Sequence, residues 1–118
     1  SEVIDTLLEA LHEAWYYLVR FYSAQLLGQL GQSDERTIQA LWHRLFLDKD
    51  SSVRIACTQA LAQLASRFPN AAETIAKKLV QAIEDPEFDK LDRVGRSGHD
   101  YAYEGLWLMV VGGEVDRG

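Results

Sequence analysis

The chain has 118 residues, 47% of them hydrophobic, and its 12 basic and 18 acidic side chains give a formal net charge of −6. This length predicts one domain with a core spread thinly along it. Nucleic-acid-binding domains usually carry a basic face because phosphate neutralisation dominates their affinity, so the acidic balance favours protein partners over nucleic acid. No apolar run reaches the roughly 18–20 residues of a membrane span, and no membrane partner is expected.

The ends of the chain and its cysteine content indicate a compartment. The chain has a single cysteine, Cys57, so an internal disulfide is impossible. The N-terminus lacks the basic segment of a secretory signal peptide, and both observations predict a reducing, cytoplasmic location. Cys57 lies on a predicted buried helix face, where we expect a small core residue rather than a reactive thiol. Because the chain starts at Ser1 without Met and stops at Gly118, we also expect a fragment of a larger protein.

The first half of the chain predicts three helices. The first covers residues 2–13, and the second covers 15–30 and is closed by Gly31, which can adopt a left-handed cap. The third begins after Ser33 or Asp34 and runs to about Leu47. The predicted buried stripe of the second helix consists of Val19, Tyr22, Ser23, Leu26, Leu27 and Leu30.

The segment 51–65 has the clearest helical period. Its apolar and small residues recur at three- and four-residue spacing, which is typical of one buried helix face. The small residues in this stripe should let another helix come close. The helix ends near Arg67, where Phe68-Pro69 interrupts it. The stripe consists of Val53, Ala56, Cys57, Ala60, Leu61 and Leu64.

Two more helices are predicted after Pro69. Asn70 with Glu73 resembles a capping box at the start of a helix that reaches Glu84. The connection 85–98 is longer than the other turns, and we expect a short helical turn within it, held against the core by Phe88 and Leu91. The last helix covers about residues 99–111 and precedes Gly112-Gly113.

The chain repeats itself. Residues 18–31 placed over 52–65, an offset of 34, share six of 14 positions, and a weaker copy of the same stripe lies 45 residues further on, at 101–109. Similarity at such periods in helical pairs predicts a solenoid. The predicted repeats cover about residues 2–31, 34–67 and 70–113.

The sequence Val53-Arg54-Ile55-Ala56, followed by Leu61 and Leu64, resembles a HEAT repeat. The resemblance implies an all-α fold, an α-α superhelix (armadillo-like α-solenoid) of about three HEAT-like hairpins in a short right-handed stack. It further implies a non-catalytic protein-binding scaffold whose inner helices present a concave surface. In the family, the Arg after the Val commonly reaches the Asp before the turn. Asp48 and Arg54 are therefore the expected structural staple, whereas the first repeat has Ala14 in place of the Asp.

The segment Gly98–Trp107 is also similar to helical-repeat tails of bacterial signalling NTPases of the NACHT class. That resemblance implies a bacterial sensor or scaffold part without the nucleotide site. The terminal helices are apolar rather than polar caps, so we expect flanking repeats or self-association at the ends.

Two groups of side chains are candidates for contacts with a partner protein. Aromatic residues outside the buried stripes either anchor a partner or pack against a neighbouring repeat. Glutamines on successive inner helices either line a concave groove or form a solvated face. The partner-binding candidates are Tyr17, Phe21, Gln25, Gln59, Gln63 and Tyr103.

Neither catalytic nor cofactor-binding nor metal-ligating residues are predicted. The three histidines fall on three separate helices, without ligands at metal spacing. Asp85, Glu87 and Asp89 start like a calcium loop, but Lys90 and Arg96 occupy the positions that need Gly and Glu. Two alternative functions stay open at this stage. One is a HEAT-like bilin lyase-type subunit that holds a tetrapyrrole on its concave face, and the other is a nucleic-acid-binding helical repeat.

Overall fold

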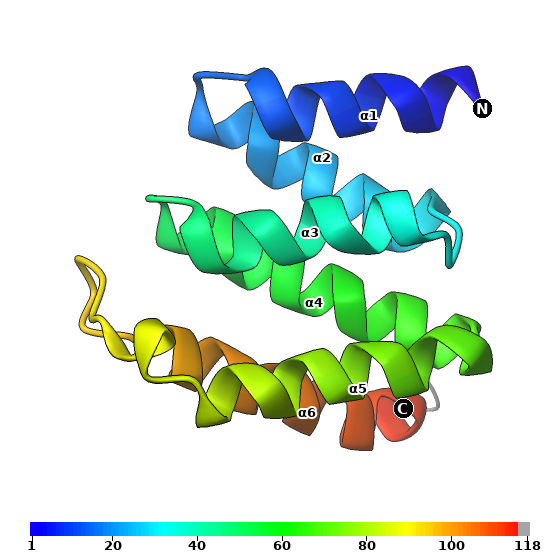
Figure 1. Ribbon diagram of the computed structural model, residues 1–118. Coiled ribbons are helices and arrows are strands. Elements are labelled where there is room, and N and C mark those ends of the chain that lie inside the picture. Colours follow the sequence, from blue (N-terminus) through cyan, green and yellow to red (C-terminus); the bar gives the residue numbers. More distant parts are fainter. Residues whose placement is uncertain (116–118) are drawn as a thin grey trace.

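The structure is a computed structural model that describes residues 1–115, which form six α-helices and one 3-10 helix. The helices stack in three pairs, with α1, α3 and α5 in one layer and α2, α4 and α6 in the layer behind it (Figure 1). The predicted all-α stack of three helical hairpins is thereby confirmed. The elements are α1 (Glu2–Glu13), α2 (Tyr17–Leu30), α3 (Glu35–Leu47), α4 (Ser51–Arg67), α5 (Pro69–Glu84), η1 (Pro86–Asp89) and α6 (Gly98–Val115).

Helix α4 is the centre of the core and contacts α2, α3, α5 and α6. Its first turn is capped by Asp50, whose carboxylate accepts from the amides of Ser52 at 3.0 Å and Val53 at 3.4 Å. The predicted stripe is buried along its whole length. Small side chains bring α2 close, because a Cβ placed on Gly28 would lie 2.8 Å from the Cα of Ala60.

The predicted burial of α2 is wrong for four of the six predicted residues. Ser23 and Leu27 are buried, but four of the six predicted core residues are exposed by 39–56%. Their counterparts 34 residues later in α4 are covered by α2, whereas no element among residues 1–115 covers α2 on its corresponding side. The exposed four are Val19, Tyr22, Leu26 and Leu30.

Two helix starts differ from the prediction. Helix α2 begins at Tyr17 rather than Trp15, because the backbone of Ala14 and Tyr16 is extended. Helix α5 begins at Pro69, one residue ahead of the predicted cap Asn70, and no side chain caps its first turn. Proline is favoured at the first helical position because its missing N–H would have no partner there and its φ already suits a helix.

The connection between α5 and α6 is an ordered segment, which we call the strap (residues 85–97). It contains η1, a single antiparallel bridge between Leu91 and Ser97, and a turn in which Gly95 has a φ of +78°. Phe88 packs on Phe46 with ring centroids 4.3 Å apart, as predicted. Leu91 is 69% exposed, so the prediction that it holds the strap against the core is wrong.

Helix α6 begins with a capping box that the sequence reading missed. The Ser97 hydroxyl accepts from the amide of Asp100 at 3.2 Å, and the Asp100 carboxylate accepts from the amide of Ser97 at 2.9 Å. The helix continues to Val115, beyond the predicted end at Val111. Among residues 1–115, no helix combines the length and apolarity needed to cross a membrane.

Candidate functional site

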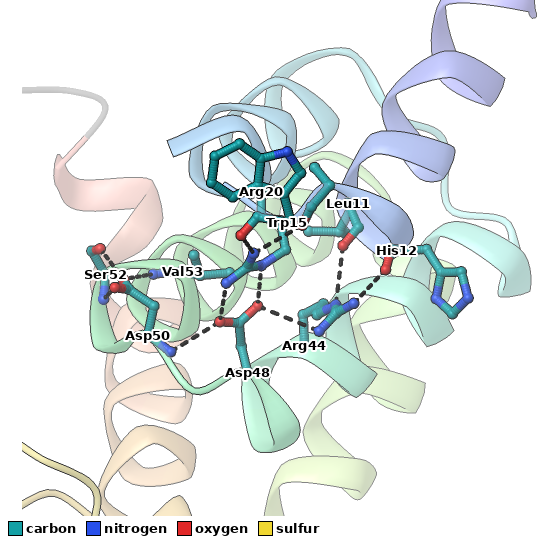
Figure 2. A network of polar contacts seen from close by, with 10 residues as sticks. Leu11, His12, Trp15, Arg20, Arg44, Asp48, Asp50, Ser52 and Val53 are labelled. Atoms are coloured by element: carbon teal, nitrogen blue, oxygen red, sulfur yellow. Dashed lines mark hydrogen bonds and ion pairs between the residues drawn. The ribbon is translucent and has the colours of Figure 1, made fainter. Parts of the chain in front are cut away.

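The first two helix pairs are joined by a buried ion pair between Arg20 of α2 and Asp48, which ends α3 (Figure 2). The guanidinium donates twice to the carboxylate, at 2.8 and 3.0 Å, and both side chains lie almost out of solvent. Such two-pronged pairs fix orientation as well as distance. The pair therefore sets how α2 sits on the turn between α3 and α4.

Neighbouring groups satisfy the rest of this network. Arg20 also donates to the carbonyl oxygens of Ala14 at 2.9 Å and Trp15 at 3.1 Å, which tie down the turn before α2. The carboxylate of Asp48 accepts from the amide of Asp50 at 2.9 Å. Arg44 approaches the same carboxylate to 3.7 Å and donates to the carbonyl of Leu11 at the end of α1. One carboxylate thus holds the ends of four helices in register.

The expected pairing of Arg54 with Asp48 is wrong. Arg54 instead donates to the carbonyl of Leu45 at 2.8 Å and to the carboxylate of Asp92 at 3.3 Å. Each arginine reaches forward to the carboxylate of the next repeat, Arg20 to Asp48 and Arg54 to Asp92. Asp48 is already taken by Arg20, which the sequence reading left without a partner. Both predicted staple residues thus form staples, but not with each other.

Asp92 organises the strap. Its carboxylate accepts from the Tyr101 hydroxyl at 2.6 Å and from the amides of Val94 and Arg96, each at 3.0 Å. Burial opposes its ionisation, but these hydrogen bonds and the Arg54 charge outweigh burial and hold the pKa of Asp92 below its ordinary value. The carboxylate therefore stays charged and keeps the strap closed over the start of α6.

Tyr101 completes this second joint. Its ring lies between two guanidinium groups, those of Arg54 at 4.2 Å and Arg96 at 4.4 Å from the centroid. Burial, and then the hydrogen bond to Asp92, raise the pKa of Tyr101 to about 12. The phenol is therefore a fixed donor at neutral pH. The buried, fully paired cluster therefore holds the strap against the start of α6.

The predicted glutamine row comes together on the inner helices. Gln25 and Gln29 of α2 and Gln59 and Gln63 of α4 line one hollow of about 90 Å³ whose floor is Ala56 and Ala60. The three predicted glutamines are half-buried or exposed, so their amides are accessible from solvent. Each amide offers a donor and an acceptor. The row can therefore hydrogen-bond the backbone of another polypeptide.

A second hollow adjoins the first and shares Gln59 and Gln63 with it. It has a volume of about 230 Å³, lies between α4 and α6, and is mainly apolar. None of the residues that line either hollow is charged. We call the two together the inner groove. The residues that complete the second hollow are Ala62, Ser66, Leu108, Val111 and Gly112.

The predicted aromatic candidates divide into two kinds. Tyr17 is 39% exposed and Tyr103 is 59% exposed, so both rings can meet another molecule. Phe21 is only half-buried, but it packs against the core and against the ring of Tyr22, 5.0 Å away. Phe21 therefore contributes to the fold in addition to any contact it makes.

The sequence reading missed a second surface. Trp15, in the turn before α2, is 87% exposed, and four apolar residues along α2 itself, Val19, Tyr22, Leu26 and Leu30, are 39–56% exposed. The signal was present in the repeat offset, because these four residues lie 34 positions before a stripe of α4 that α2 covers, and no element among residues 1–115 covers them.

The described residues include no group of three His, Cys, Asp or Glu side chains placed to hold a metal ion. The family model for HEAT repeats matches residues 4–93. The chain belongs to the HEAT-repeat family. The HEAT match runs from α1 into the strap, so α6 lies outside it. No curated protein and no solved structure matches this HEAT-repeat chain.

Proposed function

We propose that this HEAT-repeat chain is a non-catalytic interaction module whose inner groove binds a segment of a partner protein. The observation that carries the proposal is the joining of the two hollows through Gln59 and Gln63. One hollow offers amide groups for a peptide backbone, and the other offers apolar walls for a side chain. Binding sites commonly combine a mostly apolar surface with a few well-placed polar groups.

The charge of the groove indicates the type of segment. Its lining residues carry no Lys or Arg to neutralise phosphates, which supports a polypeptide rather than nucleic acid. They carry no carboxylate either, so the best match is a neutral stretch of chain with one apolar side chain seated against Leu108 and Val111. Tyr17 and Tyr103 are proposed as additional contacts on the same two inner helices, α2 and α6.

The test is a peptide-display selection against the folded chain. We expect enriched peptides whose binding is lost in a Gln59→Lys, Gln63→Glu double variant, because charges replace the neutral amides. A Lys77→Gln variant is the matched control, since Lys77 lies exposed on α5 and pairs only with Glu73, at 3.5 Å. The proposal fails if no peptide enriches, or if enriched peptides bind the groove variant and the parent equally.

Tyr17→Ala provides a second measurement within the same assay. The ring is exposed on a helix that is held elsewhere by Arg20, so the variant should fold like the parent and bind selected peptides more weakly. Phe21→Ala is the less informative change, because that ring also packs on the core.

The wider assignments stay predictions. These are membership of a bacterial NACHT-class NTPase, a cytoplasmic location, and further repeats or self-association at the ends of the stack. The division of the chain into repeats at about 2–31, 34–67 and 70–113 is also proposed on the internal offsets alone.

A further inference from the structure

The two hollows of the inner groove use one pattern of residues on α4 twice. Four residues of α4 line the small hollow beside α2, and the four that line the large hollow beside α6 lie three positions further along in each case. The first set is Ala56, Gln59, Ala60 and Gln63, and the second set is Gln59, Ala62, Gln63 and Ser66. The two shared glutamines therefore stand between two sites of different character.

This arrangement sets the distance between the hollows. A shift of three residues moves about 4.5 Å along the axis of α4. Because one hollow lies on each side of α4 within the layer of inner helices, their centres are also about one helix spacing apart, which is about 8–10 Å (Figure 1). The two displacements together place the hollows about 9–11 Å apart.

That distance selects among the conformations of a bound peptide. Side chains on one face of a β-strand lie about 6.6 Å apart at a spacing of two residues and about 13 Å apart at a spacing of four, so neither fits. Polyproline II has three residues per turn and a rise of about 3.1 Å, so residues three apart share a face at about 9.3 Å. In an α-helix, residues seven apart lie about 10.5 Å from each other and also fit.

The glutamine amides favour polyproline II over the α-helix. Four of them surround the small hollow, and none forms a hydrogen bond within residues 1–115. They reach solvent, because Thr37 Oγ1 is the only buried side-chain polar atom without a partner in this part of the chain. An α-helix uses its backbone N–H and C=O groups internally, whereas polyproline II leaves its carbonyls free to accept from these amides.

The two hollows differ in the side chain that they suit. The small one, of about 90 Å³, is bordered by carboxamides, so it suits asparagine, whose own carboxamide can donate to and accept from glutamine. The large one, of about 230 Å³, is mainly apolar. It has room beside Gly112, because nothing lies within 4 Å of a Cβ added there. It therefore suits a side chain the size of leucine.

We propose that the inner groove recognises a polyproline-II segment that carries an asparagine and a leucine-sized apolar residue three positions apart. This inference rests on the proposed function and specifies the partner. The asparagine enters the small hollow and the apolar residue enters the large one. The backbone between them crosses Gln59 and Gln63, whose amides donate to its carbonyl oxygens.

The test uses six synthetic proline-rich peptides of one composition, in which asparagine and leucine are two, three or four positions apart. Each spacing is made in both orders, because the hollows do not set the direction of the bound chain. Fluorescence anisotropy with the 118-residue chain measures binding. The better of the two peptides with a spacing of three should bind at least about ten-fold more tightly than any peptide of another spacing, which corresponds to about 1.4 kcal/mol.

Two variants assign the hollows. Gln25 lines only the small hollow, so Gln25→Ala should weaken that peptide about five-fold and spare an analogue with alanine in place of asparagine. Leu108 lines only the large hollow, so Leu108→Ala should weaken the peptide and spare an analogue with alanine in place of leucine. Neither residue is fully buried, and circular dichroism checks that both variants fold.

Several results would overturn the polyproline-II inference. A different spacing that binds most tightly, or variant losses that the alanine analogues share, would overturn it and leave the groove as a peptide-binding site. Absence of binding by all six peptides would overturn it too. The peptide-display selection tests the groove separately, so failure of this inference can be told from failure of the proposed function.

Discussion

A single residue, Asp48, determines how the first two repeats sit together. Its side chain is fully buried and its charge is matched by Arg20, whose own side chain is 5% exposed. A buried pair of this kind contributes little net stability compared with apolar residues of the same shape, but breaking it leaves one charge buried without a partner. Asp48 therefore matters more for the alignment of the first two repeats than for the net stability that the ion pair contributes.

Asp48→Asn should destabilise the fold by about 3–5 kcal/mol, because the guanidinium of Arg20 stays buried without its counter-charge. Urea unfolding followed by circular dichroism measures the loss. The matched control is Asp5→Asn, which breaks an exposed pair with Arg36 and should cost less than about 1 kcal/mol. Equal losses in the two variants would contradict the role given to Asp48.

The pair of Asp92 and Tyr101 predicts a pH dependence at both extremes. The pKa of Asp92 is lowered by folding, so its contribution is present above the ordinary value of about 3.9 and is lost as pH falls through the folded pKa. The pKa of Tyr101 is raised to about 12, so its contribution is complete below about pH 10 and is lost as pH rises toward 12.

The alkaline arm can be isolated with Tyr101→Phe, which retains the ring between the two guanidinium groups and removes the hydroxyl. Between about pH 9 and 11.5, the parent should lose more unfolding free energy than the variant, as measured by urea titration at each pH. Parallel pH profiles of the two proteins would show that the hydroxyl does not bind Asp92.

At the scale of the helices, close approach depends on glycine. Gly28 of α2 lies against Ala60, where an added Cβ would be 2.8 Å from the Cα and 2.9 Å from the Cβ. Both helices are held at this distance by Arg67 of α4, which donates to the carbonyl of Gly28 at 2.6 Å and to that of Gln29 at 2.7 Å. The contact cannot widen without breaking these bonds.

Gly28→Ala should destabilise the chain by about 1–3 kcal/mol through overpacking, although alanine is the better helix former by about 1 kcal/mol. Gly112→Ala on α6 is the control, because nothing lies within 4 Å of its added Cβ, and it should be neutral or stabilising. Thermal unfolding measures the stability of both variants. A stabilised Gly28→Ala variant would show that α2 and α4 have room to separate.

The helices that the sequence predicted best are those covered on both sides. The stripe of α4 is buried as its period indicates, because other helices surround it. The period of α2 predicted the same burial for Val19 and Tyr22 and was wrong, since periodicity finds an apolar face but not the element that covers it. The staple of Arg54 was misplaced for a related reason. Its partner, Asp92, lies in an insertion that the repeat pattern does not describe.

At the scale of the whole molecule, α4 joins the two ends of the stack. It contacts every other α-helix of the described chain except α1, so the two outer pairs, α1–α2 and α5–α6, meet mainly through it. Repeat proteins gain stability from contacts between neighbouring repeats, and a defect in a central repeat therefore breaks contacts on both sides.

Leu61→Asp should unfold the entire chain rather than one pair, because Leu61 is 1% exposed and a carboxylate there would be buried without a partner. Circular dichroism at 222 nm and tryptophan fluorescence should both report an unfolded chain under conditions in which the parent is folded. Retained helicity with a cooperative melt would contradict the central position of α4.

The single thiol of the chain lies in that same central helix. Cys57 has no exposed surface, and burial raises the pKa of its thiol, so the folded form presents neither access nor thiolate to a disulfide reagent. The labelling rate of the unmodified protein therefore reports how often α4 opens, and it should rise with urea in parallel with global unfolding. The native Cys57 can thus be used to follow transient opening of the stack without an engineered probe.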